Sequence, residues 1–132
     1  MSDAISFRPM TAGDIDTVLK IEYAAFSHPW TRGIFTDSLT AYNCWVMLEG
    51  EQQVGHGVIQ IIMDEAHLLN ITVKIESQGR GLGLKLLEHL MQQAQARAVA
   101  GHATRAPTLV GRRVNTLFPA AWPRFLLLAA ST

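Results

Sequence analysis

Apolar and polar positions in the N-terminal third of the chain predict one strand followed by two helices. Apolar residues alternate with polar ones over residues 4–10, which is the period of a strand. Over residues 11–26 they recur at helical intervals instead, and Thr11 and Asp14 have the spacing of a capping box at a helix start. A second, shorter helix is expected after Thr31, because threonine is a favourable N-cap residue.

The middle of the chain has the pattern of a sheet. Three consecutive strands are predicted over residues 43–48, 53–62 and 66–73, which are rich in Val, Ile and other strand formers. Gly50 falls where a hairpin turn would join the first two. A leucine stripe at helical spacing then predicts an amphipathic helix over residues 80–98.

Composition narrows the class of protein. The chain has 132 residues, 48% of them hydrophobic, which fits one domain with a core of its own. Basic and acidic residues balance at 11 each, so net charge gives no case for nucleic acid or a membrane as a direct partner. The single Cys44 forms no internal disulfide, and no signal peptide or apolar run of about 20 residues is found. We therefore expect a cytoplasmic protein, with Cys44 buried in its strand.

The segment "SQGRGLGLKLL" at residues 77–87 places three glycines at alternate positions directly before the leucine helix. Glycine lets main-chain N–H groups approach a ligand, and a helix start adds unpaired donors and a positive dipole end. The segment predicts an anion site, and a tight turn without a ligand is the alternative. Dinucleotide and Walker loops do not fit, because leucine stands where the former needs its last glycine and Lys85 is followed by Leu86.

A wider motif surrounds these glycines. Residues 78–83 read Gln-x-x-Gly-x-Gly after a strand and before a helix, which resembles the acetyl-CoA motif of the GNAT acetyltransferase superfamily. The stretches "DEAHLLNITVKIESQGRGLGLKLLEHL" and "FSHPWTRGIF" resemble its ribosomal-protein-alanine N-acetyltransferases, and the similarity covers residues 4–97. The resemblance implies an α/β (α+β) fold of the GNAT type. Its sheet would be mixed, mostly antiparallel and flanked by helices, with a C-terminal part that is incomplete or irregular.

The resemblance also implies how acetyl-CoA, as a cosubstrate, would bind. Main-chain groups of the last strand would pair with the pantetheine arm and help hold the thioester carbonyl, and loop amides would hold the pyrophosphate. The residues carried over in this way are Ile71, Thr72 and Val73 of the strand and Gln78, Gly79, Arg80, Gly81, Leu82, Gly83 and Leu84 of the loop. Ile71 and Val73 also fit the role of core residues. The two roles are compatible, because the family uses the backbone of these residues to bind the coenzyme and not their side chains.

The function implied is acetyl-CoA-dependent N-acetylation of a protein N-terminal α-amino group, most specifically the N-terminal alanine of a ribosomal protein. An α-amino group has a pKa of about 7.7–8.0, against about 10.4 for lysine, so it is the easier nucleophile near neutrality. The partner expected is thus the N-terminal peptide of a ribosomal protein. The alternative is a non-catalytic or defective acyl-CoA-binding module.

The C-terminal segment leaves that alternative open. The family's catalytic glutamate and tyrosine have no counterpart after residue 98, so no catalytic residue is assigned. All acidic residues lie at or before Glu88, and the last five basic residues are all arginine. We therefore divide the chain into an acetyl-CoA-binding core, 1–98, and an atypical tail, 99–132, that is either read out of frame or disordered. A missing strand would then expose the edge of strand 66–73.

Few other residues are candidates for chemistry. The five histidines show no metal-ligand spacing, so no metal is predicted. Asp64 and Glu65 fit a base near the cleft or a solvated turn between strands. Trp30 fits either a contact to a peptide substrate or a core position.

Overall fold

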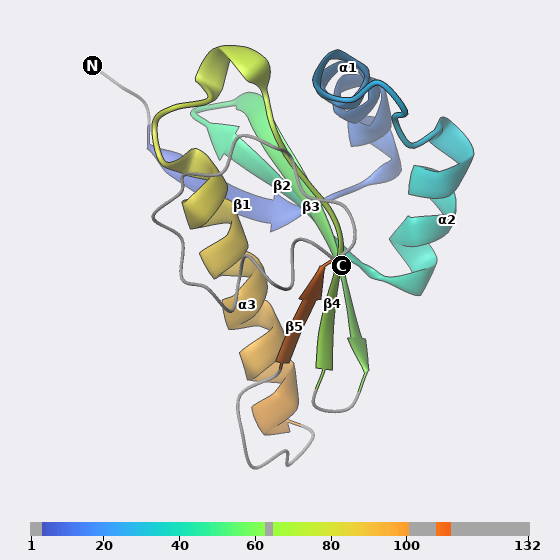
Figure 1. The fold of residues 1–132 in the computed structure, drawn as a ribbon, viewed down its shortest axis with the longest axis vertical. Helices are drawn as coiled ribbons and strands as arrows, with labels where there is room; N and C mark the ends of the chain where they lie inside the picture. Colours follow the sequence, from blue (N-terminus) through green and yellow to red (C-terminus); the bar gives the residue numbers. More distant parts are fainter. Residues whose placement is uncertain (1–3, 63–64, 101–107, 112–132) are drawn as a thin grey trace.

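Residues 4–62, 65–100 and 108–111, which the computed structural model describes, form a five-stranded sheet with helices on both faces (Figure 1). The strands lie across the sheet in chain order: β1 (Ile5–Pro9), β2 (Asn43–Glu49), β3 (Gln52–Ile62), β4 (Glu65–Val73) and β5 (Thr108–Gly111). β1 to β4 are antiparallel neighbours, whereas β5 runs parallel to β4. The mixed, mostly antiparallel sheet expected from the sequence is confirmed.

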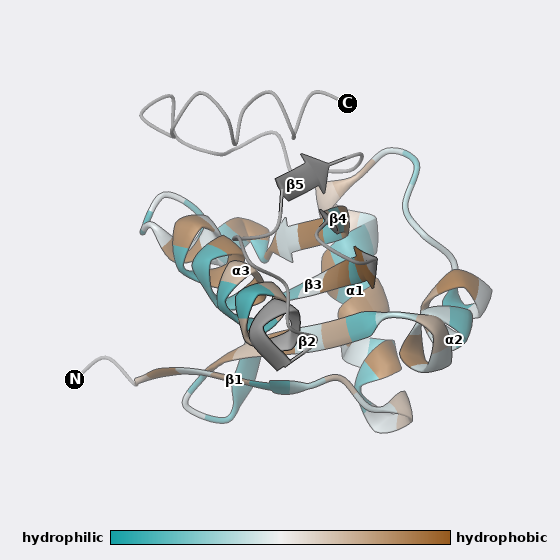
Figure 2. Ribbon diagram, turned by 90° about the horizontal axis from the view of Figure 1, so that it is seen from below, coloured by the Kyte–Doolittle hydropathy of each residue, from teal (hydrophilic) through white to brown (hydrophobic). Residues whose placement is uncertain are grey.

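The helices are divided between the two faces of the sheet. They are η1 (Ala12–Asp14), α1 (Ile15–Ala25), α2 (Arg32–Ala41), η2 (Ile75–Ser77) and α3 (Leu82–Ala100). Figure 2 shows α3 on one face and α1 with α2 on the other. The sheet is therefore covered on both sides, which places the central strands β3 and β4 in the interior.

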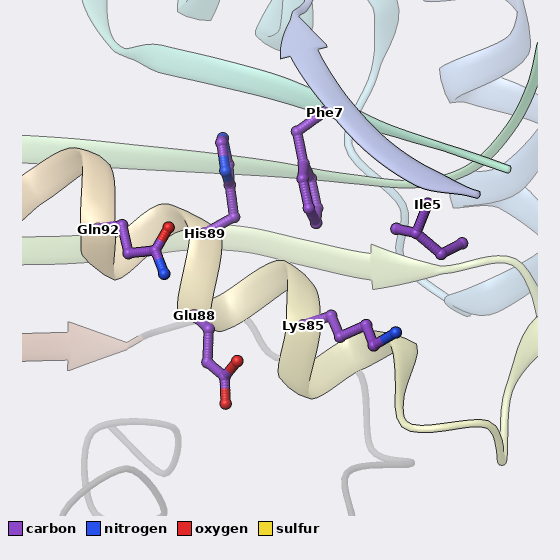
Figure 3. A pocket seen from close by; sticks show the side chains of 6 residues that line it. All are labelled: Ile5, Phe7, Lys85, Glu88, His89 and Gln92. Carbon is purple, nitrogen blue, oxygen red and sulfur yellow. The ribbon is translucent and has the colours of Figure 1, made fainter. Parts of the chain in front are cut away.

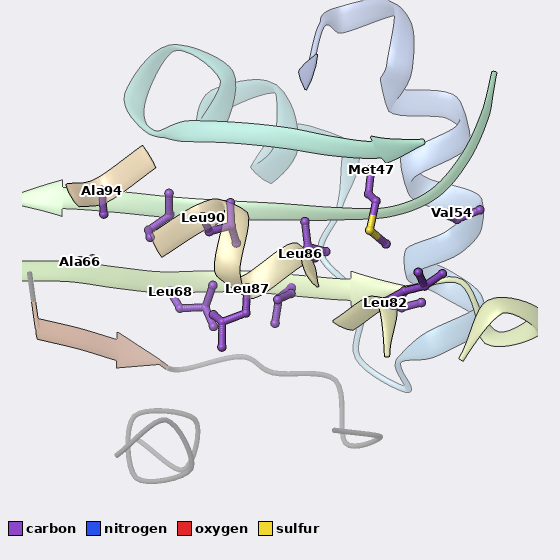
Figure 4. Close-up of a cluster of buried hydrophobic side chains, with 12 residues drawn as sticks. Met47, Val54, Ala66, Leu68, Leu82, Leu86, Leu87, Leu90 and Ala94 are labelled. Carbon is purple, nitrogen blue, oxygen red and sulfur yellow. The ribbon is translucent and has the colours of Figure 1, made fainter. Parts of the chain in front are cut away.

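A leucine stripe attaches α3 to the sheet. The residues at four-residue intervals along the helix are at most 4% exposed: Leu82, Leu86, Leu90 and Ala94. They pack on apolar side chains of β3 and β4, including Ile59, Leu68 and Ile71 (Figure 4). This is the amphipathic helix that the sequence predicts, starting two residues later than Arg80.

A second apolar cluster fills the other face. Phe35 of α2 and Val18 of α1 are fully buried against Val46 and Val58. Cys44 is buried beside them, as predicted, and burial raises the pKa of its thiol to about 11. A thiol with such a pKa stays protonated at neutral pH, so Cys44 is a packing residue and not a nucleophile.

The start of α1 depends on a buried carboxylate. The predicted capping box is present, and the Thr11 N–H donates to Asp14 Oδ2 over 2.8 Å. Arg8 of β1 donates to both oxygens of Asp14, at 2.7 and 2.8 Å. The hydrogen bond from Arg8 is the main reason that the pKa of Asp14 falls from 3.8 to about 2. Asp14 thereby joins the edge strand to the first helix.

Part of the predicted tail belongs to the sheet. The expectation that no strand flanks β4 is wrong for Glu65–Leu68, because Thr108–Gly111 pair with them. Four residues are too short a run for periodicity to identify as a strand. The boundary at residue 98 stays a prediction, although α3 crosses it by two residues. Residues 101–107 and 112–132 of the tail, and Asp64, lie outside the described residues.

We expect Asp14→Asn to lower the free energy of unfolding by about 1–2 kcal/mol, because it weakens a part-buried charged pair whose arginine is half exposed. Urea denaturation at pH 7 measures the change. Since the pKa is depressed in the folded protein, the contribution is complete above pH 3.8 and disappears as the pH falls toward about 2. Asp16→Asn, which removes an exposed pair with Arg32, is the control and should change little. Equal losses in both variants would contradict this role for Asp14.

Candidate functional site

The edge of β4 is open in its C-terminal half. β3 pairs Val58 with Asn70 and Ile59 with Leu68, so Leu69 is an extra residue that forms a β-bulge. β5 pairs with β4 only up to Leu68. Within the described residues, β4 beyond the bulge therefore has no strand partner on that side. Its outward main-chain groups need another partner, and an extended amide-containing ligand is one that fits.

The glycine loop begins where this open edge ends. Gly79 and Gly81 have φ values of 83° and 76°, in the left-handed region that glycine adopts without strain. Nothing lies within 4 Å of a Cβ built on either residue, so the backbone conformation and not space requires glycine there. Successive residues of this kind turn their N–H groups toward one side, as in the concave anion sites of other proteins.

The start of α3 adds further donors to the loop. The Lys85 N–H donates to Gly81 O over 3.3 Å, which is the first helical hydrogen bond. The N–H groups of Leu82, Gly83 and Leu84 precede it and have no partner four residues back within the helix. These amides and the positive end of the helix dipole favour an anion at this point. Loop and helix start thus form one continuous set of main-chain donors.

Gln78 and Arg80 hold the loop by their side chains. Gln78 Nε2 donates to Val73 O over 2.8 Å, which ties the loop to the end of β4. Arg80 Nη1 donates to Glu49 Oε1 over 3.1 Å, and hydrogen bonding from Arg80 is the main reason that the pKa of that carboxyl is lowered. Both side chains are therefore bonded to other residues of the protein. The family resemblance predicts that these two residues bind the ligand. Their role toward a ligand stays a prediction. Because their side chains are bonded within the protein, the main chain is the part of each residue that we expect to contact a ligand.

The three predicted strand residues lie on the open half of β4 and alternate between its faces. Ile71 and Val73 are 0% and 6% exposed in the core under α3, so they are core residues as well as edge residues. Thr72 points to the opposite face, where its hydroxyl lies 3.1 Å from Glu22 Oε1 and 2.9 Å from Asn70 Oδ1 and can donate to one of them. The main chain of Thr72 faces β3, so a ligand at this edge would meet the main-chain groups of Ile71 and Val73, of which Val73 O already accepts from Gln78.

Sequence reasoning missed a buried polar cluster beneath this edge. Glu22 of α1, His56 of β3 and Asn70 and Thr72 of β4 are each 0% exposed and share hydrogen bonds. One signal for it is present in the sequence, since Glu22 stands four residues after the buried Val18, on the apolar face of the helix. A carboxylate at such a position needs buried donors.

A separate groove lies between β1 and α3, at the other edge of the sheet from β5 (Figure 3). It measures about 270 Å³ and is lined by Ile5, Phe7, Lys85, Glu88, His89 and Gln92. The His89 ring stacks on Phe7 with 4.2 Å between ring centroids, and burial lowers its pKa. The groove is thus separated from the open edge of β4 by the body of α3.

Among residues 4–62, 65–100 and 108–111, no three His, Cys, Asp or Glu side chains come together as metal ligands would. Within the same residues, no helix has the length and hydropathy needed to span a membrane.

Comparison with known proteins identifies the family. Residues 15–111 match the model of the acetyltransferase (GNAT) family. The chain belongs to the GNAT family. It is 32% identical over 88 residues to the [ribosomal protein bS18]-alanine N-acetyltransferase of Escherichia coli K12, an alignment that covers 66% of this chain and 60% of the relative. The chain thus spans less than two thirds of the length of that relative.

Solved GNAT structures share the fold. The ribosomal-protein-S18-alanine N-acetyltransferase of Escherichia coli superposes with a TM-score of 0.73 at 24% identity, over 97% of this chain and 76% of that one. The PaiA N-acetyltransferase of Thermoplasma acidophilum, solved in complex with coenzyme A, gives 0.62 at 14% identity, over 73% and 75% of the two chains. At such identities the likeness shows the fold alone, which agrees with the GNAT-type sheet expected from the sequence.

We expect Gly81→Ala to lower the free energy of unfolding by about 1–2 kcal/mol, because alanine is strained at the positive φ of this position. Thermal or urea unfolding measures the loss. Gly33→Ala is the matched control, since Gly33 lies in the first turn of α2 with ordinary space around it, and it should be neutral or slightly stabilising. A fully stable Gly81→Ala protein would show that the loop does not hold this conformation in solution.

Proposed function

We propose that this GNAT protein is an acetyl-CoA-dependent N-acetyltransferase. The observation that carries the proposal is the continuity of the open edge of β4 with the donors of residues 79–84. A coenzyme needs both, because pantetheine is an extended amide chain and the pyrophosphate is an anion. The pantetheine arm would pair with residues 71–73, and the pyrophosphate would lie at the start of α3. Coenzyme A in the related PaiA structure supports this choice of ligand.

The acceptor we propose is the α-amino group of a protein, specifically an N-terminal alanine of a ribosomal protein. The activity printed for the Escherichia coli relative supports this choice. The lower pKa of an α-amine leaves more of it unprotonated near neutral pH than of a lysine amine. A ribosomal substrate and the absence of cystine pairing with one cysteine both fit a cytoplasmic enzyme.

The chemistry needs little covalent help from the protein. The amine attacks the thioester carbonyl, a tetrahedral oxyanion forms, and the C–S bond breaks as the acetyl group passes to nitrogen. Main-chain N–H groups at the open edge would stabilise the oxyanion, and the thiolate takes up one proton while the amine releases one. Holding both reactants in register supplies most of the remaining acceleration.

One sequence feature favours a second candidate, an acyl-CoA-binding module without turnover. The chain has no Asp, Glu, Lys or Tyr after residue 88, and the family's acid and base are expected in that part. Such a module would keep the coenzyme loop and the open edge and lose proton transfer. The two candidates therefore differ in product formation and not in coenzyme binding.

Calorimetric titration of acetyl-CoA into the full chain should show saturable binding. Gly81→Ala should weaken it by about tenfold, which corresponds to about 1.4 kcal/mol, because the loop amides lose their common direction. Gly33→Ala, the control outside the loop, should bind like the unaltered protein. Absence of binding by a folded sample would contradict both candidates.

A peptide that begins with alanine should gain an acetyl group on its α-amine when incubated with the protein and acetyl-CoA. Mass spectrometry with fragmentation locates the group. The control peptide carries a blocked N-terminus and one lysine, and it should stay unmodified near pH 7.5, since its amine is almost fully protonated. Binding of acetyl-CoA without any product would select the binding module instead.

A further inference from the structure

The carboxylate of Glu22 collects hydrogen bonds from three separate parts of the chain. His56 Nε2 of β3 lies 3.0 Å from Oε1, and the hydroxyl of Thr72 lies 3.1 Å from the same oxygen and 2.9 Å from Asn70 Oδ1, only one of which can accept its single proton. Oε2 accepts from Asn70 Nδ2 and from the main-chain N–H of Trp30, each over 3.1 Å. One side chain of α1 thereby contacts β3, β4 and the elbow between α1 and α2, residues 26–31.

The carboxylate is ionised in this setting. Burial by itself raises the pKa of Glu22, but the hydrogen bonds from His56, Trp30 and Asn70 outweigh burial and keep the pKa below its ordinary value. A carboxylate has acceptor sites for several donors on its two oxygens. A glutamine of the same shape would turn an NH₂ group toward some of these donors, so the buried arrangement is specific for glutamate.

The hydrogen-bonded residues flank the position proposed for the thioester. Asn70 and Thr72 lie on either side of Ile71, in the half of β4 beyond the bulge, where β5 no longer pairs. The α3 side of this segment is filled, because Ile71 packs with Leu86 and Leu90. Asn70 and Thr72 fill the opposite side against Glu22, so an acceptor amine would approach the edge of β4 between these two layers.

The elbow itself is fixed from several directions. The ring of Trp30 lies 5.2 Å from that of Phe35, and the Phe35 ring lies edge-on to His56 at 5.5 Å. The main chain of Trp30 is bonded to Glu22, while its side chain is only partly buried. The main chain of Trp30 is thus fixed relative to Glu22, and its ring lies beside Phe35.

We propose that Glu22 is a positioning residue for acetyl transfer, which locks the elbow at Trp30 to the open half of β4. The acceptor peptide, held at the elbow, then meets a thioester held at residues 70–73 at a fixed separation. This proposal rests on the proposed function. Glu22 is not a general base, because it is 0% exposed and its oxygens already accept from donors of the protein.

The test compares Glu22→Gln with Asp14→Asn. Asp14 is the matched control, because it is also a buried carboxylate bonded by several donors, but those donors belong to Arg8, Thr11 and Gln53 and not to the elbow or residues 70–73. Amide exchange measured by NMR reports the lock directly. We expect Glu22→Gln to speed exchange at Trp30 and at residues 70–72 by about ten- to a hundredfold, the range for one lost hydrogen bond to a charged group. Asp14→Asn should leave those amides unchanged.

The kinetics of acetylation of the alanine peptide give a second test of this role for Glu22. Glu22→Gln should raise the KM for the peptide and lower kcat, each by about tenfold or more, because the elbow and β4 are no longer held in a fixed position relative to each other. A purely structural role would scale activity only with the folded fraction, as expected for Asp14→Asn. Unchanged exchange at Trp30, or equal kinetic effects in the two variants, would overturn the proposal.

A milder pair of variants covers the case in which Glu22→Gln does not fold. Thr72→Val removes the hydroxyl that lies between Glu22 Oε1 and Asn70 Oδ1 at nearly constant shape, and Thr72→Ser keeps it. The valine variant should show faster exchange at Trp30 and a higher peptide KM, and the serine variant should restore both. If neither measurement separates the two, Glu22 does not act as proposed.

Failure of the proposed function gives a different pattern. A folded wild-type protein that neither binds acetyl-CoA nor acetylates the peptide would contradict that function, and with it the role in transfer, whatever the exchange rates. An active wild type with an unaffected Glu22→Gln variant would contradict the positioning role alone.

Discussion

The extra residue in β4 is the constraint on which the rest of the site depends. Leu69 forms a bulge against β3, and the parallel pairing with β5 reaches only to Leu68. A bulge bends its strand and locally disrupts the ladder with β3, and within the described residues β5 accompanies β4 only as far as this point. The four residues that follow keep β3 on one side, and Ile71 and Val73 turn their main-chain groups to the other, where no strand lies among the described residues. A continuous ladder would have used those groups within the protein.

The glycine loop serves this edge because α3 is fixed in place by its apolar stripe. Leu82, Leu86 and Leu90 pack against β3 and β4, which sets where the helix begins relative to the end of β4. The loop has only to connect Val73 with Leu82, and Gln78 shortens that path by its hydrogen bond to Val73 O. Packing thus directs the helix dipole and the loop amides toward the same end of the open edge. The guanidinium of Arg80 pairs with Glu49, and its predicted contact to a ligand stays a prediction.

The face under α1 and α2 adds a polar cluster to an otherwise apolar interior. A buried charge is unfavourable unless donors surround it, and Glu22 has donors from β3, β4 and the elbow. Such a cluster is sensitive to small displacements, because a donor that moves away leaves an unpaired group at low dielectric. The polar cluster differs in this respect from the leucine packing on the other face, because apolar contacts do not depend on direction as hydrogen bonds do. The open half of β4 is held by the directional contacts on one face and by close packing on the other.

The sequence by itself determined the local features of this protein. Alternation and helical spacing located β1 to β4 and the helices, the Thr11–Asp14 spacing located a cap, and the glycines located the loop, because each depends on residues within a few positions of one another. The tertiary structure alone decided the bulge at Leu69, the short strand β5 and the hydrogen-bond partners of Glu22. The residues bonded to Glu22 from β3 and β4 are 34 to 50 positions away in the chain. The register of the strands brings these residues together. That register is set by packing between distant parts of the chain, so it cannot be predicted from a local sequence pattern.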